Sequence, residues 1–89
     1  MNREQFATAL AAGPWAWPGG YPLFFISSDG EAISFAAAKD NAALIGDAID
    51  ENDNSGWRVM AVDINWEDAA LYCAHTGERI PSAYGEDGA

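Results

Sequence analysis

The spacing of apolar residues near the start of the chain predicts a short helix. Phe6 and Leu10 lie four positions apart, so their side chains fall on one helical face. Asn2 precedes them with Gln5 three positions later, which is the pattern of a capping box. Gly13, followed directly by a proline, ends the pattern. We therefore predict a first helix that begins after Asn2 and ends before Gly13.

Residues 14–22 interrupt all periodicity, because this stretch contains three prolines and two glycines. An apolar run at residues 23–27 follows. An Asp-Gly turn at residues 28–31 separates it from a second short run at residues 32–35. We predict irregular structure over residues 14–22 and a β-hairpin after it.

The next segment predicts a second helix, from residue 35 or 36 to Asp50. Its apolar residues recur at steps of three and four, so they form one buried stripe. The stripe comprises Phe35, Ala38, Ala42, Ile45 and Ile49. Gly46 lowers the helix propensity by up to about 1 kcal/mol but permits close packing.

Apolar and polar residues alternate over residues 57–66, which is typical of a half-buried strand. The predicted apolar face carries Met60, Val62, Ile64 and Trp66, and the other face carries Asp63 and Asn65. Residues 71–73 and 79–80 flank a turn and predict a short final hairpin. The order α-β-β-α-β-β indicates an α+β fold, a small antiparallel sheet with two helices. We assign residues 1–84 to a single α+β domain and residues 85–89 to a frayed acidic tail.

Composition favours a folded domain over a disordered acidic chain, since 49% of the residues are hydrophobic and 12% are aromatic. No apolar run approaches the roughly 20 residues that span a bilayer. The N-terminus lacks the apolar core of a signal peptide. The single cysteine, Cys73, excludes an internal disulfide and suits a reducing compartment. We therefore expect a cytoplasmic protein.

Charge narrows the class of partner. The chain contains fourteen acidic and four basic residues, which give a formal net charge of −10. Residues 46–89 account for −8 of this charge. Such a field repels nucleic acid and anionic membranes and attracts basic partners. A surface designed only for solubility mixes both signs and carries a net charge of about 2–8 in magnitude.

Cys73 and His75 are the residues that invite an enzymatic or metal hypothesis. A catalytic thiolate needs a base within hydrogen-bond reach, but a strongly negative protein is expected to raise the pKa of a thiol. The segment Cys73-Ala-His-Thr-Gly-Glu-Arg-Ile80 resembles half of a zinc-ribbon knuckle, with Thr76 in place of the second cysteine. Structural zinc requires four Cys or His ligands, and the chain contains two in total. We expect no enzyme activity, catalytic residue, metal or cofactor; a carboxylate-assisted or intermolecular metal site is the alternative.

Trp15 and Trp17 lie in the Pro/Gly-rich loop and allow two interpretations. A proline-restrained loop can fold its tryptophans over a small core. Alternatively, the two rings form an exposed contact of a protein–protein adaptor. Stacking on single-stranded nucleic acid is disfavoured, because such sites pair aromatic residues with a basic groove.

The acids of the second helix form the most specific pattern. On one continuous helix, Asp40, Asp47 and Glu51 fall within about 40° of one another, at axial steps of roughly 10 Å and 6 Å. Successive phosphates of a DNA strand follow one another at a comparable spacing. Asp50 and Asp53 extend this row. A second patch comprises Asp63, Glu67 and Asp68, for which no pocket or oxyanion donor suggests hydrolytic chemistry.

In size, acidity, α+β build and lack of catalytic motifs, the chain resembles the small acidic anti-CRISPR proteins of phages and mobile elements. Several of these inhibitors act as nucleic-acid mimics. The resemblance implies a stoichiometric inhibitor in the host cytoplasm that blocks DNA or PAM recognition by a type I CRISPR surveillance complex. Its partner would be the basic, DNA-recognising subunit, with no direct contact to nucleic acid or membrane. The family shares no sequence motif, so the partner-binding residues rest on the acidic pattern alone: Asp40, Asp47, Asp50, Glu51, Asp53, Asp63, Glu67 and Asp68. The alternatives are the Trp15/Trp17 adaptor and a small thiol- or metal-dependent enzyme.

Overall fold

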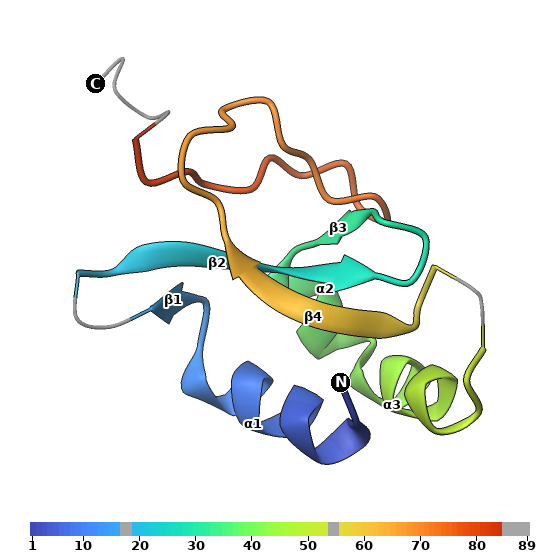
Figure 1. Cartoon of the computed structure of the whole chain (residues 1–89). Helices are drawn as coiled ribbons and strands as arrows, with labels where there is room; N and C mark the ends of the chain where they lie inside the picture. Colours follow the sequence, from blue (N-terminus) through green and yellow to red (C-terminus); the bar gives the residue numbers. More distant parts are fainter. Residues whose placement is uncertain (17–18, 54–55, 85–89) are drawn as a thin grey trace.

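The computed structural model of the chain describes residues 1–16, 19–53 and 56–84. It combines helices with a small antiparallel sheet, which confirms the α+β prediction (Figure 1). The predicted order of elements is only roughly correct, because a short extra strand precedes the hairpin and the second helix is divided. The elements are α1 (Arg3–Ala12), β1 (Trp15–Ala16), β2 (Tyr21–Ser27), β3 (Ala32–Ile33), α2 (Phe35–Asp40), α3 (Ala42–Asp50) and β4 (Val59–Ile64).

Helix α1 begins and ends where the sequence predicts. The Asn2 side chain accepts a hydrogen bond from the Gln5 backbone, and the Gln5 side chain accepts one from the Asn2 backbone, so the capping box is complete. Gly13 follows the last residue with φ +93°, a backbone conformation that L side chains rarely adopt. Phe6 is buried and packs against Phe25 of β2, with ring centroids 5.2 Å apart.

Strand β2 is the strand to which the other three pair, each antiparallel. β1 pairs with its beginning, within the stretch for which we predicted no regular structure. β3 pairs with its end through the Asp-Gly turn, which confirms the hairpin. β4 pairs with most of its length, and Phe25 is opposite both Ile33 and Val62.

A bulge in β4 reverses part of the predicted strand pattern. Ile26 pairs with Ala61 but Ser27 pairs with Val59, so Met60 is the extra residue. Val59 is consequently fully buried, whereas 43% of Met60 is exposed. Asn65, predicted to lie on the polar face, is buried instead, with Nδ2 donating to the backbone carbonyls of Asp68 and Pro81. Its amide is satisfied inside the protein.

The predicted second helix is interrupted at Asn41. This residue has φ −121° and ψ 25°, and its side-chain Nδ2 donates to the Ala37 carbonyl at 2.8 Å. Asparagine side chains compete in this way with regular helical bonding. The break allows α2 to pack against β2 and α3 to pack against α1 and β4. Four residues of the predicted stripe are buried and the fifth, Ala42, is partly buried against the same core.

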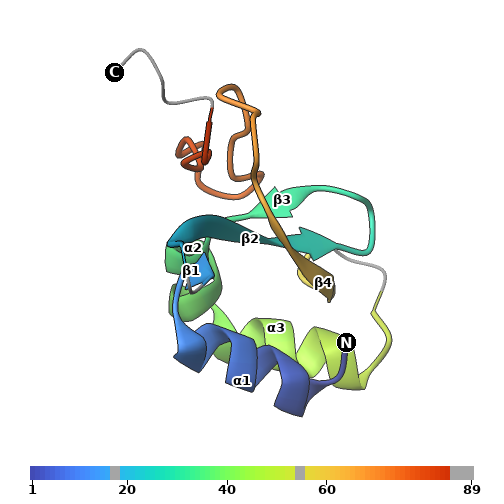
Figure 2. The same cartoon turned by 60° about the vertical axis from the view of Figure 1, so that its left-hand side comes forward.

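The helices and the C-terminal segment lie on opposite sides of the sheet. Figures 1 and 2 show α1 and α3 on one side and the chain that follows β4 on the other. The predicted final hairpin is reduced to one β-bridge between Tyr72 and Arg79, although Cys73 and Ile80 beside it are buried in the core. The predicted tail, residues 85–89, lies outside the described residues. No helix within the described ranges is long and apolar enough to cross a membrane.

Candidate functional site

All eight acids of the predicted interface are exposed to solvent. Asp40 ends α2, Asp47 and Asp50 lie on α3, and Glu51 caps the end of α3. Asp53 follows in the next loop. The structure therefore keeps the first five acids on the helical side of the molecule, but not on one helix.

The break at Asn41 corrects the geometry that we predicted for this row. The expected step of about 10 Å between Asp40 and Asp47 requires one continuous helix, and these residues belong to two different helices. Glu51 remains one turn beyond Asp47, because its backbone stays in the right-handed helical region, with φ −90° and ψ 0°. The phosphate-like spacing therefore applies to Asp47 and Glu51 only.

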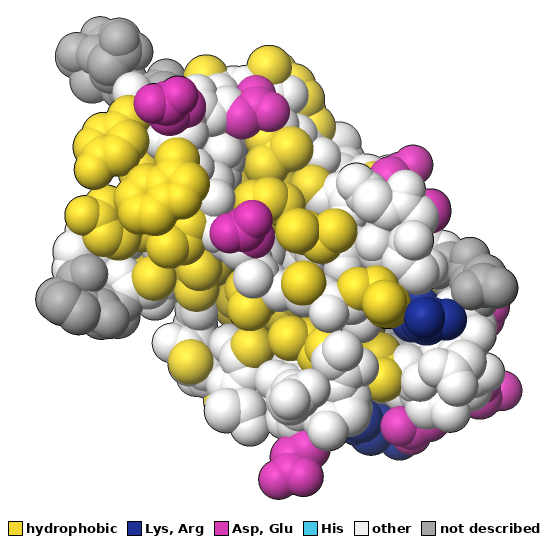
Figure 3. All heavy atoms as spheres, in the orientation of Figure 1, with side chains coloured by type: hydrophobic (Ala, Val, Ile, Leu, Met, Phe, Trp, Pro, Cys, Tyr) yellow, Lys and Arg dark blue, Asp and Glu magenta, His cyan; other side chains and the backbone are white. Residues whose placement is uncertain are grey.

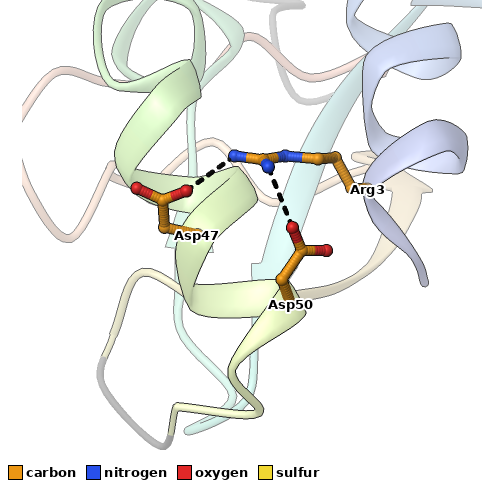
Figure 4. A network of polar contacts seen from close by, with 3 residues as sticks. All are labelled: Arg3, Asp47 and Asp50. Carbon is orange, nitrogen blue, oxygen red and sulfur yellow. Dashed lines mark hydrogen bonds and ion pairs between the residues drawn. The ribbon is translucent and has the colours of Figure 1, made fainter.

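Arg3 of α1 binds two of the α3 acids. Its Nη2 is 2.8 Å from Asp47 Oδ1 and its Nη1 is 2.8 Å from Asp50 Oδ2 (Figure 4). The guanidinium lies against the backbone of Gly46. A β-carbon at position 46 would come within 2.9 Å of Arg3 Cζ, so a larger residue there would collide with the guanidinium. Gly46 thus provides the close packing that we predicted, between a side chain of α1 and the backbone of α3. Arg3 is one of the two basic side chains in residues 1–45, and the other is Lys39.

The second acidic patch surrounds the end of β4. Asp63 lies on β4, and its Oδ1 accepts a hydrogen bond from the Ile64 backbone at 2.8 Å. Asp68 Oδ1 accepts one from the Ala70 backbone at 2.9 Å, and Glu67 is exposed beside it. Figure 3 shows the acidic side chains of this face scattered among hydrophobic and uncharged surface rather than joined in one row.

One groove of the surface is lined by none of the candidate acids. A groove of about 930 Å³ lies between α1 and the α2–α3 pair. Its walls are mostly apolar, with Phe6, Leu10 and Phe35 among them, and its charged residues are Arg3 and Lys39. None of the eight candidate acids lines it. The candidate acids therefore lie outside this groove.

Cys73 is buried, with only 2% of its surface exposed. Burial raises the pKa of its thiol, but hydrogen bonds from Ser34, Thr76 and the His75 backbone outweigh this effect and lower the pKa from 9.0 to about 7. Our expectation that the negative charge of the chain would raise this pKa was wrong, because these local donors act at shorter range. The hydrogen bonds explain the shift without requiring the thiol to reach solvent or substrate.

The His75 ring is held by different neighbours. It stacks on Trp57 with centroids 3.8 Å apart and an interplanar angle of 7°, and its Nε2 is 2.9 Å from the Gly56 carbonyl oxygen. Asp29 lies close enough for the His75 charge to help lower its pKa, after the larger effect of a hydrogen bond from Ser27. Among the described residues, no group of three or more His, Cys, Asp or Glu side chains could hold a metal ion.

The aromatic residues include a cluster that the sequence analysis missed. Trp15, in β1, is 42% exposed, while Trp17 lies outside the described residues. Trp66 contacts Tyr21 with ring centroids 4.8 Å apart and stacks beside Tyr84 at 6.1 Å. A hydrogen bond with the Tyr21 side chain raises the pKa of Tyr84, because it stabilises the protonated Tyr84 hydroxyl. We assigned Trp66 to the strand's apolar face, and no local pattern connects it to residues 45 positions before and 18 positions after it.

Comparisons with protein families, with curated proteins and with solved structures found no match to this chain. The surface of the described residues carries exposed acids and exposed aromatic rings.

Proposed function

We propose that this protein is a stoichiometric inhibitor of a nucleic-acid-binding protein and that its acidic surface takes the place of DNA. The observation that carries the proposal is that all eight acids are exposed to solvent in a chain of net charge −10. Exposed carboxylates keep their charge and can meet the basic residues of a DNA-binding channel directly. Long-range attraction then guides the encounter.

The partner that we propose is the DNA-recognising subunit of a type I CRISPR surveillance complex. Occupation of the basic surface that first contacts duplex DNA would block PAM recognition without any chemical step. Asp40, Glu51 and Glu67 form no ion pair within the described part of the chain, so their charges are available for such a contact. Asp47 and Asp50 take part only to the extent that Arg3 releases them.

Charge reversal on the helical side tests this proposal. We expect Asp40→Lys combined with Glu51→Lys to weaken binding to the purified complex by more than about tenfold, because two attractions become repulsions. Displacement of labelled duplex DNA measures inhibition, and circular dichroism verifies folding. Binding of the wild-type chain should also weaken steeply between about 50 and 500 mM salt.

A double variant with the same total charge is the control. Glu31→Lys combined with Glu78→Lys alters two exposed acids outside the candidate set. We expect it to change the affinity by less than about threefold, since screened charges act mainly at close range. If Asp40→Lys/Glu51→Lys binds and inhibits like the wild type, mimicry through this surface is wrong.

A further inference from the structure

Three aromatic side chains, two of them exposed, form a cluster at the end of β4. Trp66 is 44% exposed and Tyr84 is 59% exposed, although each ring contacts another aromatic ring. Tyr21 supports Trp66 from the beginning of β2, with an interplanar angle of 54°. Figure 3 shows hydrophobic surface gathered in the upper left of the molecule, away from the helices α1 and α3 of Figure 1.

Backbone hydrogen bonds hold these rings in place. Tyr84 N donates to Trp66 O at 2.7 Å, and Ala83 N donates to Asn65 O at 2.8 Å. Asn65 N in turn donates to Pro22 O at 2.9 Å, beside Tyr21. The three rings are therefore carried by backbone segments that are bonded to one another. Such a surface loses little conformational freedom when a partner binds.

Acidic residues accompany the cluster. Glu67 and Asp68 follow Trp66 directly, Asp63 precedes it on β4, and all three are exposed. The sequence from residue 59 to residue 78 contains no Lys or Arg. Open aromatic faces beside carboxylates are complementary to arginine, whose planar guanidinium stacks on a ring while its N–H groups bind a carboxylate. Nucleic-acid bases also stack on aromatic rings, but their phosphates would be repelled here.

We infer that Tyr21, Trp66 and Tyr84, together with Glu67 and Asp68, form a docking surface for an arginine-bearing segment of a basic protein. The inference deepens the proposed function and rests on it for the identity of the partner, whose arginines would be recognised here. Lysine offers the same charge but neither the planar stack nor the paired N–H donors. The surface therefore distinguishes arginine from lysine, which a purely acidic surface does not do.

The test uses two labelled nine-residue peptides, one of alternating glycine and arginine and one of alternating glycine and lysine. We expect the wild-type chain to bind the arginine peptide about three- to tenfold more tightly in fluorescence anisotropy, as stacking on exposed rings allows. Trp66→Ala and Tyr84→Ala should each reduce this preference to below about twofold. Tyr84→Ala decides the question if Trp66→Ala fails to fold, since the Tyr84 side chain is the more exposed.

Tyr72→Ala is the matched control, because Tyr72 is 54% exposed and lies at the β-bridge with Arg79. It should keep the full preference for arginine. Equal binding of both peptides by the wild type, or an unchanged preference in Tyr84→Ala, overturns the inference. Asp40→Lys/Glu51→Lys should weaken both peptides alike and leave their ratio unchanged. If the arginine preference is absent but the chain inhibits the complex, the docking surface is wrong and the proposed function stands. If the arginine preference is present but the chain does not inhibit the complex, the proposed function is wrong.

Discussion

At the scale of single residues, Arg3 decides how much acidic charge α3 presents. It reaches across from α1 and binds Asp47 and Asp50, while the absent side chain of Gly46 leaves room for its guanidinium. Both ion pairs are about half exposed, so each contributes less than about 1 kcal/mol to stability. Arg3 therefore matters more for the net charge that α3 exposes than for folding.

Gly46→Ala should displace Arg3 without unfolding the protein. The new methyl group would collide with the flexible end of Arg3, and alanine would raise helix propensity by up to about 1 kcal/mol. We expect the variant to be as stable as the wild type or slightly more stable in urea unfolding. Arg3→Ala should lower stability by about 0.5–1 kcal/mol in the wild type and by almost nothing in Gly46→Ala. An equal cost in both backgrounds would contradict this arrangement.

At the scale of elements, two local irregularities change which side chains share a surface. The bulge at Met60 turns Val59 into the core, and the break at Asn41 separates Asp40 from the acids of α3. Both are single-residue events. The bulge changes the face of the sheet on which the neighbouring residues of the strand lie, because strand faces alternate at every residue. The break changes the direction in which the following helical residues point, because a common helical face requires an unbroken helix.

Truncation of the two neighbours in β4 tests the bulge. Val59→Ala should lower the free energy of unfolding by about 2 kcal/mol, since it leaves a cavity at a fully buried position. Met60→Ala should cost less than about 0.5 kcal/mol, as is usual for exposed positions. Urea denaturation measures both. A larger loss of stability in Met60→Ala than in Val59→Ala would contradict the bulge and favour the regular alternation predicted from the sequence.

At the scale of the whole molecule, the net charge opposes folding. The described residues share one small core, built around Phe25, which packs against Phe6 and Phe35 with ring centroids 5.2 Å and 4.4 Å away. The whole chain carries a formal net charge of −10. Repulsion among these charges destabilises the compact state, and salt screens it.

Thermal stability should therefore increase with salt. We expect the melting temperature of the wild type to rise by several degrees between about 10 and 500 mM NaCl, as screening weakens the repulsion. The Asp40→Lys/Glu51→Lys variant has four fewer net negative charges and should show a smaller rise. A melting temperature that falls with salt in the wild type would mean that attractive pairs such as those of Arg3 dominate the surface electrostatics.

The sequence alone determined the features that depend on neighbouring residues. The capping box of α1, the Asp-Gly hairpin turn and the buried stripe from Phe35 to Ile49 are local signals, and the structure confirms them. The α+β class and the charge excess could also be predicted, because both follow from composition and periodicity.

Tertiary structure decided the features that depend on distant residues. Pairing between β2 and β4 places the bulge at Met60, and packing of α1 on α3 brings Arg3 to Asp47 and Asp50. The Tyr21–Trp66–Tyr84 cluster joins three segments through backbone bonds at the end of the sheet. No spacing in the chain encodes such contacts, because their energy comes from surfaces that meet only after folding. The sequence determined the amount of negative charge, and the fold decided which carboxylates pair with Arg3.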